Sequence, residues 1–487
     1  MQGTNDNQAR ERATEVFEDL TPRQIVARLD EYIVGQDDAK RAIAVAIRNR
    51  LRRLRVEGEL RDEIIPKNLI LMGPTGVGKT EIARRIARLI SAPLIKVEAS
   101  KFTEVGYVGR DVDSIVRDLT EHAVRMVRQE RLESVREMLM GRVVDRLVDY
   151  LQPLPGRPGR RRRSAASEED AEAEERRERE EEERFEQVKR LREKLRGKLR
   201  TPEMDDAQVT IEASEQGGKL MQVFTSQGLE EMGMDLQSVF DNITEKPKKK
   251  KRVSVGEAKR VLLSEEADKA VDMDAVVREA IERVELAGIV FIDEIDKIAH
   301  REGQQSHGPD VSREGVQRDI LPLVEGTTII TKYGPVRTHH ILFIAAGAFH
   351  VSKVSDLIPE FQGRFPLRVE LDSLSEQDFV RILTEPKNSL IKQYTALLST
   401  EAVTLEFSDG AVAAMAAAAT RANQESQNIG ARRLHTVLEK LLEDVSFEAP
   451  YGDGQAPEPR TVTLDEQFVE QRLAELTRDK DVADYIL

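Results

Sequence analysis

Residues 69–80 read Leu69-Ile70-Leu71-Met72-Gly73-Pro74-Thr75-Gly76-Val77-Gly78-Lys79-Thr80. The apolar run at the start predicts a short buried strand, and the glycine-rich turn leads directly into residues 81–90. In that segment, apolar residues recur at the spacing of one helix face: Ile82, Ile86, Leu89 and Ile90. Strand, glycine loop and helix in this order are the setting in which the pattern Gly-x-x-x-x-Gly-Lys-Thr binds phosphates. The stretch therefore predicts a phosphate-binding loop in an α/β fold.

The residue types in this loop suit the binding of phosphate groups. Its glycines allow the backbone to turn so that N–H groups face phosphate oxygens, aided by the positive end of the following helix. We expect Lys79 to reach the β- and γ-phosphates of ATP and the Thr80 hydroxyl to ligate Mg²⁺. A chance glycine-rich turn is the alternative, and the presence of every fixed position opposes it. The residues assigned to nucleotide binding here are Gly76, Val77, Gly78, Lys79, Thr80 and Glu81.

Composition restricts the class of protein. A length of 487 residues predicts about two to four domains, and 34% charged with 4% aromatic residues is typical of a helix-rich protein with a charged surface. The absence of cysteine excludes disulfides and cysteine nucleophiles and fits a cytoplasmic protein. The net charge of −14 opposes nucleic-acid binding as the main task. No apolar run is long enough to span a membrane, and the polar residues 1–18 lack the apolar core of a signal peptide.

A second motif complements the phosphate loop. Residues 288–296 form an apolar strand that ends in two carboxylates, Asp293 and Glu294. We expect Asp293 to hold Mg²⁺ from the end of the strand and Glu294 to polarise the water that attacks the γ-phosphate. An ordinary helix cap is the alternative for such an acidic pair. The two motifs together predict a catalytic site for ATP hydrolysis, with Lys79 and Glu294 as catalytic residues.

The spacing of the two motifs indicates an inserted domain. Lys79 and Asp293 are 214 residues apart (293 − 79), far more than one strand–helix–strand step requires. We assign residues 126–280 to a mainly helical insertion with a charged low-complexity tract at 153–200. The Glu/Arg-rich part of that tract is either a solvated helix with many i,i+4 ion pairs or a disordered segment. The basic run 246–252 is interpreted as a solvated loop rather than a nuclear-import or nucleic-acid-binding signal.

The chain after the acidic strand continues the sheet and then becomes helical. Residues 339–347, beginning with His339-His340, predict another buried strand, and residues 367–371 predict a short one. From Ser375 the pattern is helical and alanine-rich. Arg364 and Arg432 lie at junctions in this part of the chain, where they fit cationic sensors of the γ-phosphate. Surface charges are the alternative reading of the two arginines.

These observations predict an α/β protein with a parallel-sheet core, an inserted helical domain and a C-terminal helical lid. The expected domains are an N-terminal extension at 1–20, the first part of the core at 21–125, the insertion at 126–280, the second part of the core at 281–372 and the helical domain at 373–487.

Taken together, the motifs resemble the P-loop AAA+ family and, within it, the Clp/Hsp100 unfoldases of the HslU (ClpY) type. The resemblance extends from about Leu20 to the C-terminus, except for most of residues 153–200. Besides the phosphate loop, the stretches that carry it are Thr21–Val26, Tyr32–Gln36, Gly106–Asp111, Asp293-Glu294, Ile358–Arg364 and Gly430–His435.

The resemblance implies further nucleotide contacts. Ile33 and Val34 match an apolar clamp on the adenine ring; alone they would be an ordinary buried pair. Arg364 matches a catalytic arginine finger offered to the ATP of a neighbouring subunit, with Glu360 near that interface. Arg432 matches a second sensor that couples the helical lid to the phosphates. Because the finger acts on a neighbour, the resemblance implies a ring, which is a homohexamer in this family.

The resemblance also implies a motor that acts on unfolded or tagged protein substrates. The loop Gly106-Tyr107-Val108-Gly109 matches a pore loop that grips the polypeptide, although alone it would be a turn. The chain contains no Gly-x-Ser-x-Gly elbow and no His-Glu-x-x-His helix, so cleavage is assigned to a partner. The resemblance implies that this partner is a separate HslV-like ring with an N-terminal threonine nucleophile. That peptidase ring is expected to bind the C-terminal tail, for which a frayed end is the alternative. The tail residues are Asp484, Tyr485, Ile486 and Leu487.

The sequence departs from the family pattern at two points. Where many AAA+ proteins carry a polar first sensor, this chain has Ala345-Ala346-Gly347, and the tract at 153–200 is longer than the family needs. Three alternatives remain: a ClpX-type unfoldase, a nucleic-acid motor and a chaperone without a peptidase partner. The absence of a cysteine zinc module and the long insertion oppose the first, the acidic balance opposes the second, and only the C-terminal tail opposes the third.

Overall fold

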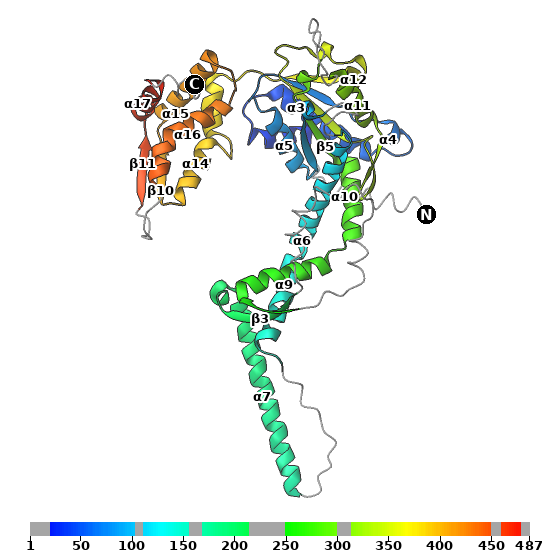
Figure 1. Ribbon diagram of the computed structural model, residues 1–487, viewed down its shortest axis with the longest axis vertical. Coiled ribbons are helices and arrows are strands. Elements are labelled where there is room, and N and C mark those ends of the chain that lie inside the picture. Colours follow the sequence, from blue (N-terminus) through cyan, green and yellow to red (C-terminus); the bar gives the residue numbers. More distant parts are fainter. Residues whose placement is uncertain are drawn as a thin grey trace. The chain divides into compact units, whose positions relative to one another are not determined.

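The computed structural model describes residues 20–102, 111–154, 168–213, 249–299, 313–449 and 459–478 (Figure 1). The chain divides into two compact units. One consists of Met1–Met126 with Val277–Leu487, and the other of Val127–Val276. The predicted gripping loop Gly106–Gly109 and the tail Asp484–Leu487 lie outside the described residues.

A parallel sheet forms the centre of the first unit. In the described residues it has five strands in the order β2-β5-β8-β1-β9. Their bounds are Leu69–Met72 (β1), Leu94–Glu98 (β2), Ile289–Asp293 (β5), Leu342–Gly347 (β8) and Leu367–Glu370 (β9). All of β8 is buried, and only the last residue of β5 is partly exposed, as expected of strands covered on both faces. The predicted α/β class with a parallel-sheet core is confirmed.

The strand predicted to begin at His339 begins three residues later. His339 and His340 lie in a turn that is closed by a hydrogen bond from Ile341 N to Thr338 O of 3.0 Å. The neighbouring strand β5 starts at Ile289, which pairs with Leu342. The two histidines therefore have no strand partner on that side, and the apolar pattern alone could not mark this limit.

Helices cover the sheet. They are α2 (Pro22–Asp30), α3 (Asp37–Leu54), α4 (Leu60–Glu63), α5 (Lys79–Leu89), α11 (Arg313–Glu325) and α12 (Pro359–Arg364). The apolar faces of α2, α3 and α5 share one core with alternate strand residues such as Leu71 and Phe291. Short elements complete this part: η1 (Ala99–Lys101), η3 (Ile295–Lys297), β6 (Thr328–Thr331), β7 (Gly334–Arg337) and η4 (Val354–Asp356).

The C-terminal part of the first unit is helical, as predicted. Its elements are α13 (Glu376–Thr384), α14 (Leu390–Ser399), β10 (Val403–Phe407), α15 (Asp409–Glu425), α16 (Arg432–Glu448), β11 (Arg460–Leu464) and α17 (Glu466–Arg478). We call this part the lid. Ser375 and Asp378 form a capping box that starts α13, and the Ser408 hydroxyl caps α15. The small parallel pair β10–β11 was not predicted.

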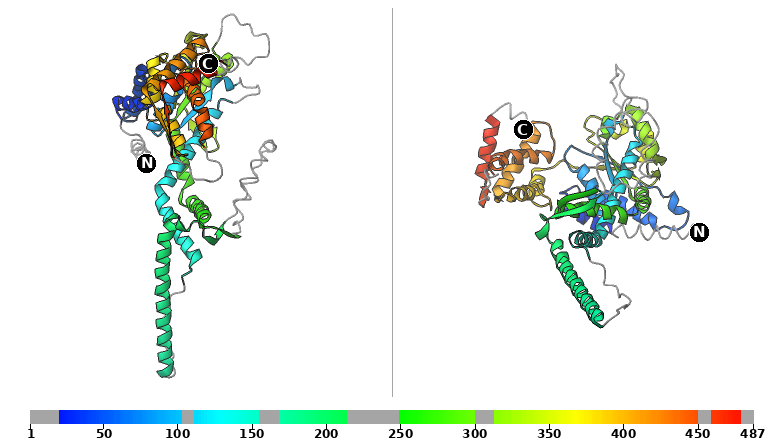
Figure 2. Two further views of the ribbon diagram at one scale, coloured as in Figure 1. Left: turned by 90° about the vertical axis from the view of Figure 1, so that its left-hand side faces the viewer. Right: turned by 60° about the horizontal axis from the view of Figure 1, so that its bottom comes forward.

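The second unit has its own apolar core, built around Val143, Leu147, Ile211 and Val253. Its elements are α6 (Ser114–Leu151), α7 (Glu168–Arg200), η2 (Pro202–Met204), β3 (Gln208–Ala213), β4 (Lys249–Ser254), α9 (Val255–Ala270) and α10 (Met273–Ala287), of which α6 and α10 belong in part to each unit. The Glu/Arg-rich tract 168–200 is one continuous helix, drawn in teal in Figure 2. A helix, not a disordered segment, is therefore the correct reading of that tract.

The prediction of a loop for the basic run 246–252 is wrong for the residues of this run that the structure describes, 249–252. Lys249–Ser254 form β4, which pairs antiparallel with β3. Val253 is buried opposite Val209, while Lys250 and Lys251 extend into solvent. Because long basic side chains can leave a strand toward water, charge density by itself did not identify a loop.

A buried arginine joins α3 to the segment that enters β5. The Arg50 guanidinium donates to the carbonyl oxygens of Leu286 (3.1 Å) and Ala287 (3.3 Å) at the end of α10, and to His340 O. Burial, with a smaller effect of the Arg53 cation, lowers the pKa of Arg50 to about 9. The side chain is still protonated at neutral pH, so it acts as a cationic cap on the last carbonyls of α10.

Asn68 fixes the strand that precedes the phosphate loop. It is buried, its Oδ1 accepts from Phe343 N (3.0 Å), and its Nδ2 donates to Arg364 O (3.1 Å). One side chain thus connects β1, β8 and the end of α12.

Asn68→Ala should lower the free energy of unfolding by about 1–3 kcal/mol, because it leaves a buried N–H without an acceptor. The measurement is the thermal unfolding midpoint, which should fall by several degrees. Asn49→Ala, on the exposed side of α3, is the matched control and should leave the midpoint unchanged. Equal midpoints for the two variants would contradict this role of Asn68.

Candidate functional site

The phosphate loop depends on glycine at two close approaches. Gly73 and Gly76 have φ values of 141° and 79°, which residues with a side chain rarely adopt. A Cβ at Gly73 would lie 2.6 Å from Leu371 O, and one at Gly76 would lie 2.0 Å from Ile429 O. The loop is therefore packed against both the edge strand and the lid, and α5 begins immediately after it at Lys79.

A cavity of about 830 Å³ lies at this loop, between the sheet and the lid. Its size is within the range of roughly 300–1,000 Å³ that is usual for small-molecule sites. It is lined by most of the residues that the sequence singled out for nucleotide binding: Ile33, Val34, Gly76, Val77, Gly78, Lys79, Thr80, Glu81, Asp293, Glu294 and Arg432. Glu360 and Arg364 are not among the described residues that line it.

The Lys79 ammonium group makes hydrogen bonds with uncharged backbone groups. Its Nζ donates to the carbonyl oxygens of Gly73 and of Pro74 (2.7 Å). Burial lowers the pKa of Lys79, the nearby carboxylates of Asp293 and Asp296 act in the opposite direction, and Arg432 lowers it further. Carbonyls satisfy the ammonium without neutralising it, so a phosphate would be its stronger partner.

The two acidic residues at the end of β5 are both engaged. Asp293 Oδ2 lies 2.8 Å from Lys96 Nζ, and Asp293 Oδ1 accepts from Glu294 N (3.0 Å). Glu294 has a left-handed backbone (φ 58°), a strained conformation that is common at functional sites.

The Glu294 carboxylate is held by a cation and a hydroxyl. It lies 2.8 Å from Lys297 Nζ and accepts from Ser100 Oγ at 3.0 Å. The hydrogen bond from Lys297 is the largest cause that lowers the pKa of Glu294; the Ser100 hydroxyl contributes, and burial opposes both. Glu294 is therefore ionised at neutral pH and can accept a hydrogen bond from a water molecule.

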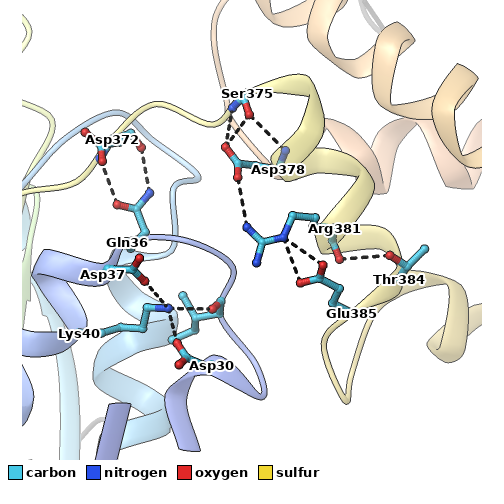
Figure 3. Close-up of polar contacts among 11 residues, drawn as sticks. Asp30, Gln36, Asp37, Lys40, Asp372, Ser375, Asp378, Arg381, Thr384 and Glu385 are labelled. Atoms are coloured by element: carbon cyan, nitrogen blue, oxygen red, sulfur yellow. Dashed lines mark hydrogen bonds and ion pairs between the residues drawn. The ribbon is translucent and has the colours of Figure 1, made fainter. Parts of the chain in front are cut away.

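Residues 31–36, which we call the strap, carry Ile33 and Val34 to the cavity wall. Figure 3 shows the polar contacts of Gln36 and Lys40 that hold this segment. The Gln36 side chain forms two hydrogen bonds with the backbone of Asp372, from Nε2 to Asp372 O (2.9 Å) and from Asp372 N to Oε1 (3.0 Å). Buried Lys40 donates to Ile33 O (3.3 Å) and pairs with Asp30 (2.5 Å). The strap is thus fixed to α3 and to the linker that leads from β9 to the lid.

The other end of the strap contacts the lid. Lys387 N donates to Glu31 O (2.9 Å), and Lys387 Nζ pairs with Glu31 Oε2 (2.8 Å). Beside the strap, the Arg85 guanidinium lies 3.9 Å from the centre of the Tyr32 ring, and Glu81 pairs with Arg85 at 2.7 Å. The Glu81 carboxylate is therefore committed to its own helix.

The turn before α16 brings Arg432 to the phosphate loop. Ala431 N donates to Gly76 O (3.1 Å), and a Cβ at Gly430 would lie 2.5 Å from Thr75 O. Arg432 lines the cavity. The adjacent Arg433 turns away and donates to Ser426 Oγ (2.7 Å). Of these two neighbouring arginines, Arg432 lines the cavity, and it is the one for which the sequence predicts a nucleotide contact.

Arg364 ends α12 and is 44% exposed. Its guanidinium pairs with Glu325 at 2.9 Å, and Glu360 is exposed on the same short helix. Their proposed action on a neighbouring subunit's nucleotide requires a second copy of the chain and stays a prediction.

Sequence reasoning missed several residues of the site. Lys96 and Ser100 hold the two carboxylates, and Gln36 was quoted only as part of a motif. The roles of Lys96 and Ser100 depend on which strand lies beside β5, and that of Gln36 on a linker far away in the chain; the sequence contains no local signal for either. The sequence assigns no first sensor. A Cβ at Gly347 would lie 2.8 Å from Asp296 Oδ1, so a side chain at this position would require neighbouring side chains to shift.

Comparison with known proteins agrees with this geometry. Residues 69–135 match the family model described as ATPase family associated with various cellular activities (AAA), and residues 207–368 match the AAA domain (Cdc48 subfamily). The fold and the site therefore define an ATP-binding AAA+ ATPase.

Relatives identify the narrower family. The ATP-dependent protease ATPase subunit HslU of Syntrophomonas wolfei is 53% identical over 470 residues, which are 96% of this chain and 99% of the relative. The HslU of Myxococcus xanthus is 56% identical over 474 residues, with the same coverage of both chains. The subunit ClpY of Bacillus subtilis is 51% identical over 468 residues, again 96% of this chain and 99% of the relative. The chain belongs to the HslU (ClpY) family of ATPase subunits of ATP-dependent proteases. Among the described residues, no helix is both long and apolar enough to cross a membrane.

Gln36→Asn should weaken ATP binding by roughly 3- to 10-fold, because the shorter amide cannot make both hydrogen bonds to Asp372 and the strap loosens. Asparagine tolerates the left-handed backbone of this position (φ 59°), so backbone strain is not introduced. The measurement is titration with a fluorescent ATP analogue together with KM and kcat, of which KM should rise and kcat should stay nearly constant.

Gln24→Asn is the matched control, because Gln24 caps α2 and does not bond the linker. Unchanged affinity in Gln36→Asn, or an equal loss in both variants, would contradict the role of Gln36.

Proposed function

We propose that this chain is the ATP-driven unfoldase and translocase of a two-component protease, which feeds unfolded or tagged proteins to a separate HslV-like threonine peptidase ring. The observation that carries the proposal is the relatedness to HslU subunits over nearly the whole chain, together with a cavity that collects the phosphate loop, the acidic pair and Arg432. Chaperone activity without the peptidase belongs to the same proposal, as does a cytoplasmic location.

The residues of the cavity fit a Mg²⁺–ATP complex. The glycines of the loop have no Cβ, so a phosphate can approach their backbone N–H groups. Lys79 donates hydrogen bonds to carbonyl oxygens, and Asp293 presents a carboxylate at the end of a strand. Thr80 and Asp293 would hold Mg²⁺, which when bound neutralises charge on the phosphates. Lys79 would bind the phosphate oxygens, and Ile33 with Val34 would cover the base.

Hydrolysis requires an oriented water molecule and a stabilised transition state. The ionised Glu294 carboxylate would orient and polarise that water. Arg432 would contribute a cation from the lid, so that occupation of the site and the position of the lid become linked. Arg364, exposed at the end of α12, would complete the site of a neighbouring subunit in a homohexameric ring.

Arg364→Ala should retain ATP binding and lose ATPase activity by about 10³- to 10⁵-fold, as for other arginine fingers. Glu294→Gln should be equally inactive. An equal mixture of the two variants, assembled together, should regain about a quarter of the wild-type rate, because a random ring then contains sites with both groups intact. Arg368→Ala, which removes another exposed arginine nearby, is the control for charge. Absence of any recovery in the mixture would rule out a site shared between subunits.

The mechanical step is assigned to the loop Gly106-Tyr107-Val108-Gly109, with Tyr107 as the gripping residue. An aromatic side chain contacts extended polypeptides of any sequence, which suits a motor with many substrates. The peptidase contact is assigned to the C-terminal tail Asp484–Leu487, whose aromatic and aliphatic side chains could fill a pocket between peptidase subunits. A chaperone without a peptidase partner is the alternative that this tail opposes.

Degradation of casein in the presence of ATP and a threonine peptidase ring tests both assignments. Tyr107→Ala should keep substantial ATPase activity and lose degradation. A variant that lacks Tyr485–Leu487 should keep both ATPase activity and chaperone activity and lose degradation alone. Full degradation by Tyr107→Ala would contradict the assignment of Tyr107 as the gripping residue. Full degradation by the variant without Tyr485–Leu487 would contradict the assignment of the tail as the peptidase contact.

A further inference from the structure

The strand β2 places a cation against the acidic end of β5. The two strands run parallel, with Lys96 opposite Phe291 and Glu98 opposite Asp293. Side chains two positions apart on neighbouring strands share a face of the sheet, so Lys96 and Asp293 lie diagonally on one face. Their contact, from Nζ to Oδ2, measures 2.8 Å.

This contact occupies the carboxylate that the proposed function assigns to the metal. Asp293 Oδ1 already accepts from Glu294 N at 3.0 Å, so groups of the chain itself engage both of its oxygens. The Lys96 side chain is 39% exposed and that of Asp293 20% exposed, which places the pair at the border of the site. Lys96 is not one of the described residues that line the cavity, so it is poorly placed to act as a phosphate contact.

The local charge balance explains why a cation is needed there. Glu98 lies directly opposite Asp293, and Asp296 follows three residues later in the chain. Like charges in such positions repel. Lys101 pairs with Glu98 at 3.1 Å, and Lys96 pairs with Asp293. Each of the two facing carboxylates thus has its own lysine.

We propose that Lys96 is a positioning residue that holds Asp293 when no metal is present and competes with the divalent cation for the same carboxylate. The inference rests on the proposed role of Asp293 as a metal ligand. An ammonium group and a divalent cation on one carboxylate repel each other, and at a partly exposed site this repulsion is only partly screened. Lys96 therefore sets the metal affinity of the site below that of the carboxylate alone. Held in this way, the Asp293 carboxylate keeps its orientation between binding events.

The test uses Mn²⁺ as the probe, with the full-length protein saturated with ADP, and measures the loss of the free Mn²⁺ signal in electron paramagnetic resonance. Lys96→Met should bind Mn²⁺ about 3- to 10-fold more tightly than the wild type at low ionic strength. The difference should shrink at about 0.5 M salt, where charges on exposed groups are screened. Lys96→Arg, which keeps the cation, should resemble the wild type.

Lys101→Met is the matched control, because it removes one lysine charge close by without touching Asp293. It should leave Mn²⁺ affinity within about twofold of the wild type, since its charge is largely exposed to solvent. Binding of ADP in the presence of a chelator should be the same in all variants, which shows that the fold and the nucleotide pocket are intact.

Two results would overturn the inference: equal Mn²⁺ affinity in Lys96→Met and wild type, or weaker affinity in Lys96→Met, which would mean that the lysine assists the metal. Asp293→Asn separates this failure from failure of the proposed function. If Asp293→Asn binds Mn²⁺ as well as the wild type does, then Asp293 is not a ligand and both the assignment and the inference fall.

Discussion

The nucleotide site depends on a contact between two backbones. At the point where the lid meets the phosphate loop, Ala431 N donates to Gly76 O at 3.1 Å, and neither Gly76 nor Gly430 has room for a Cβ. Because no side chain intervenes, the approach cannot be adjusted by a change of rotamer. The position of Arg432 is therefore set by the backbone of the predicted phosphate loop, and a displacement of one element displaces the other.

The strap makes a second connection between core and lid, on the base side of the cavity. Gln36 bonds the backbone of Asp372 where the chain leaves the sheet, and Glu31 bonds Lys387 in the lid. Ile33 and Val34 lie between these two points, so the residues that would cover the base are held by both the sheet and the lid. The cavity is thus enclosed by elements that are far apart in sequence but joined by hydrogen bonds and an ion pair.

The sequence predicts those features of the fold and the site that contiguous sequence patterns encode. The phosphate loop and the acidic strand are contiguous patterns, so Lys79 and Asp293 could be placed on one sheet before the fold was known. Lys96 and Ser100 could not be found, because their partners follow from the strand order β2-β5, which no local pattern encodes. The same limit explains His339 and His340, whose apolar neighbours suggested a strand but whose pairing partner begins only at Ile289. Gln36 was visible as a motif, but its function depends on a linker 336 residues away.

A common principle connects the charged groups of the site. Asp293 is held by Lys96, Glu294 by Lys297 and Ser100, and Lys79 by two carbonyls. Each of these three groups therefore already has a partner within the chain, and binding would exchange these internal contacts for new ones. The net affinity is the difference between the two sets, which is smaller than the sum of the new contacts. A site built in this way avoids an unpaired buried charge when it is empty and also avoids holding its product too tightly, which an ATPase that must release ADP in every cycle requires.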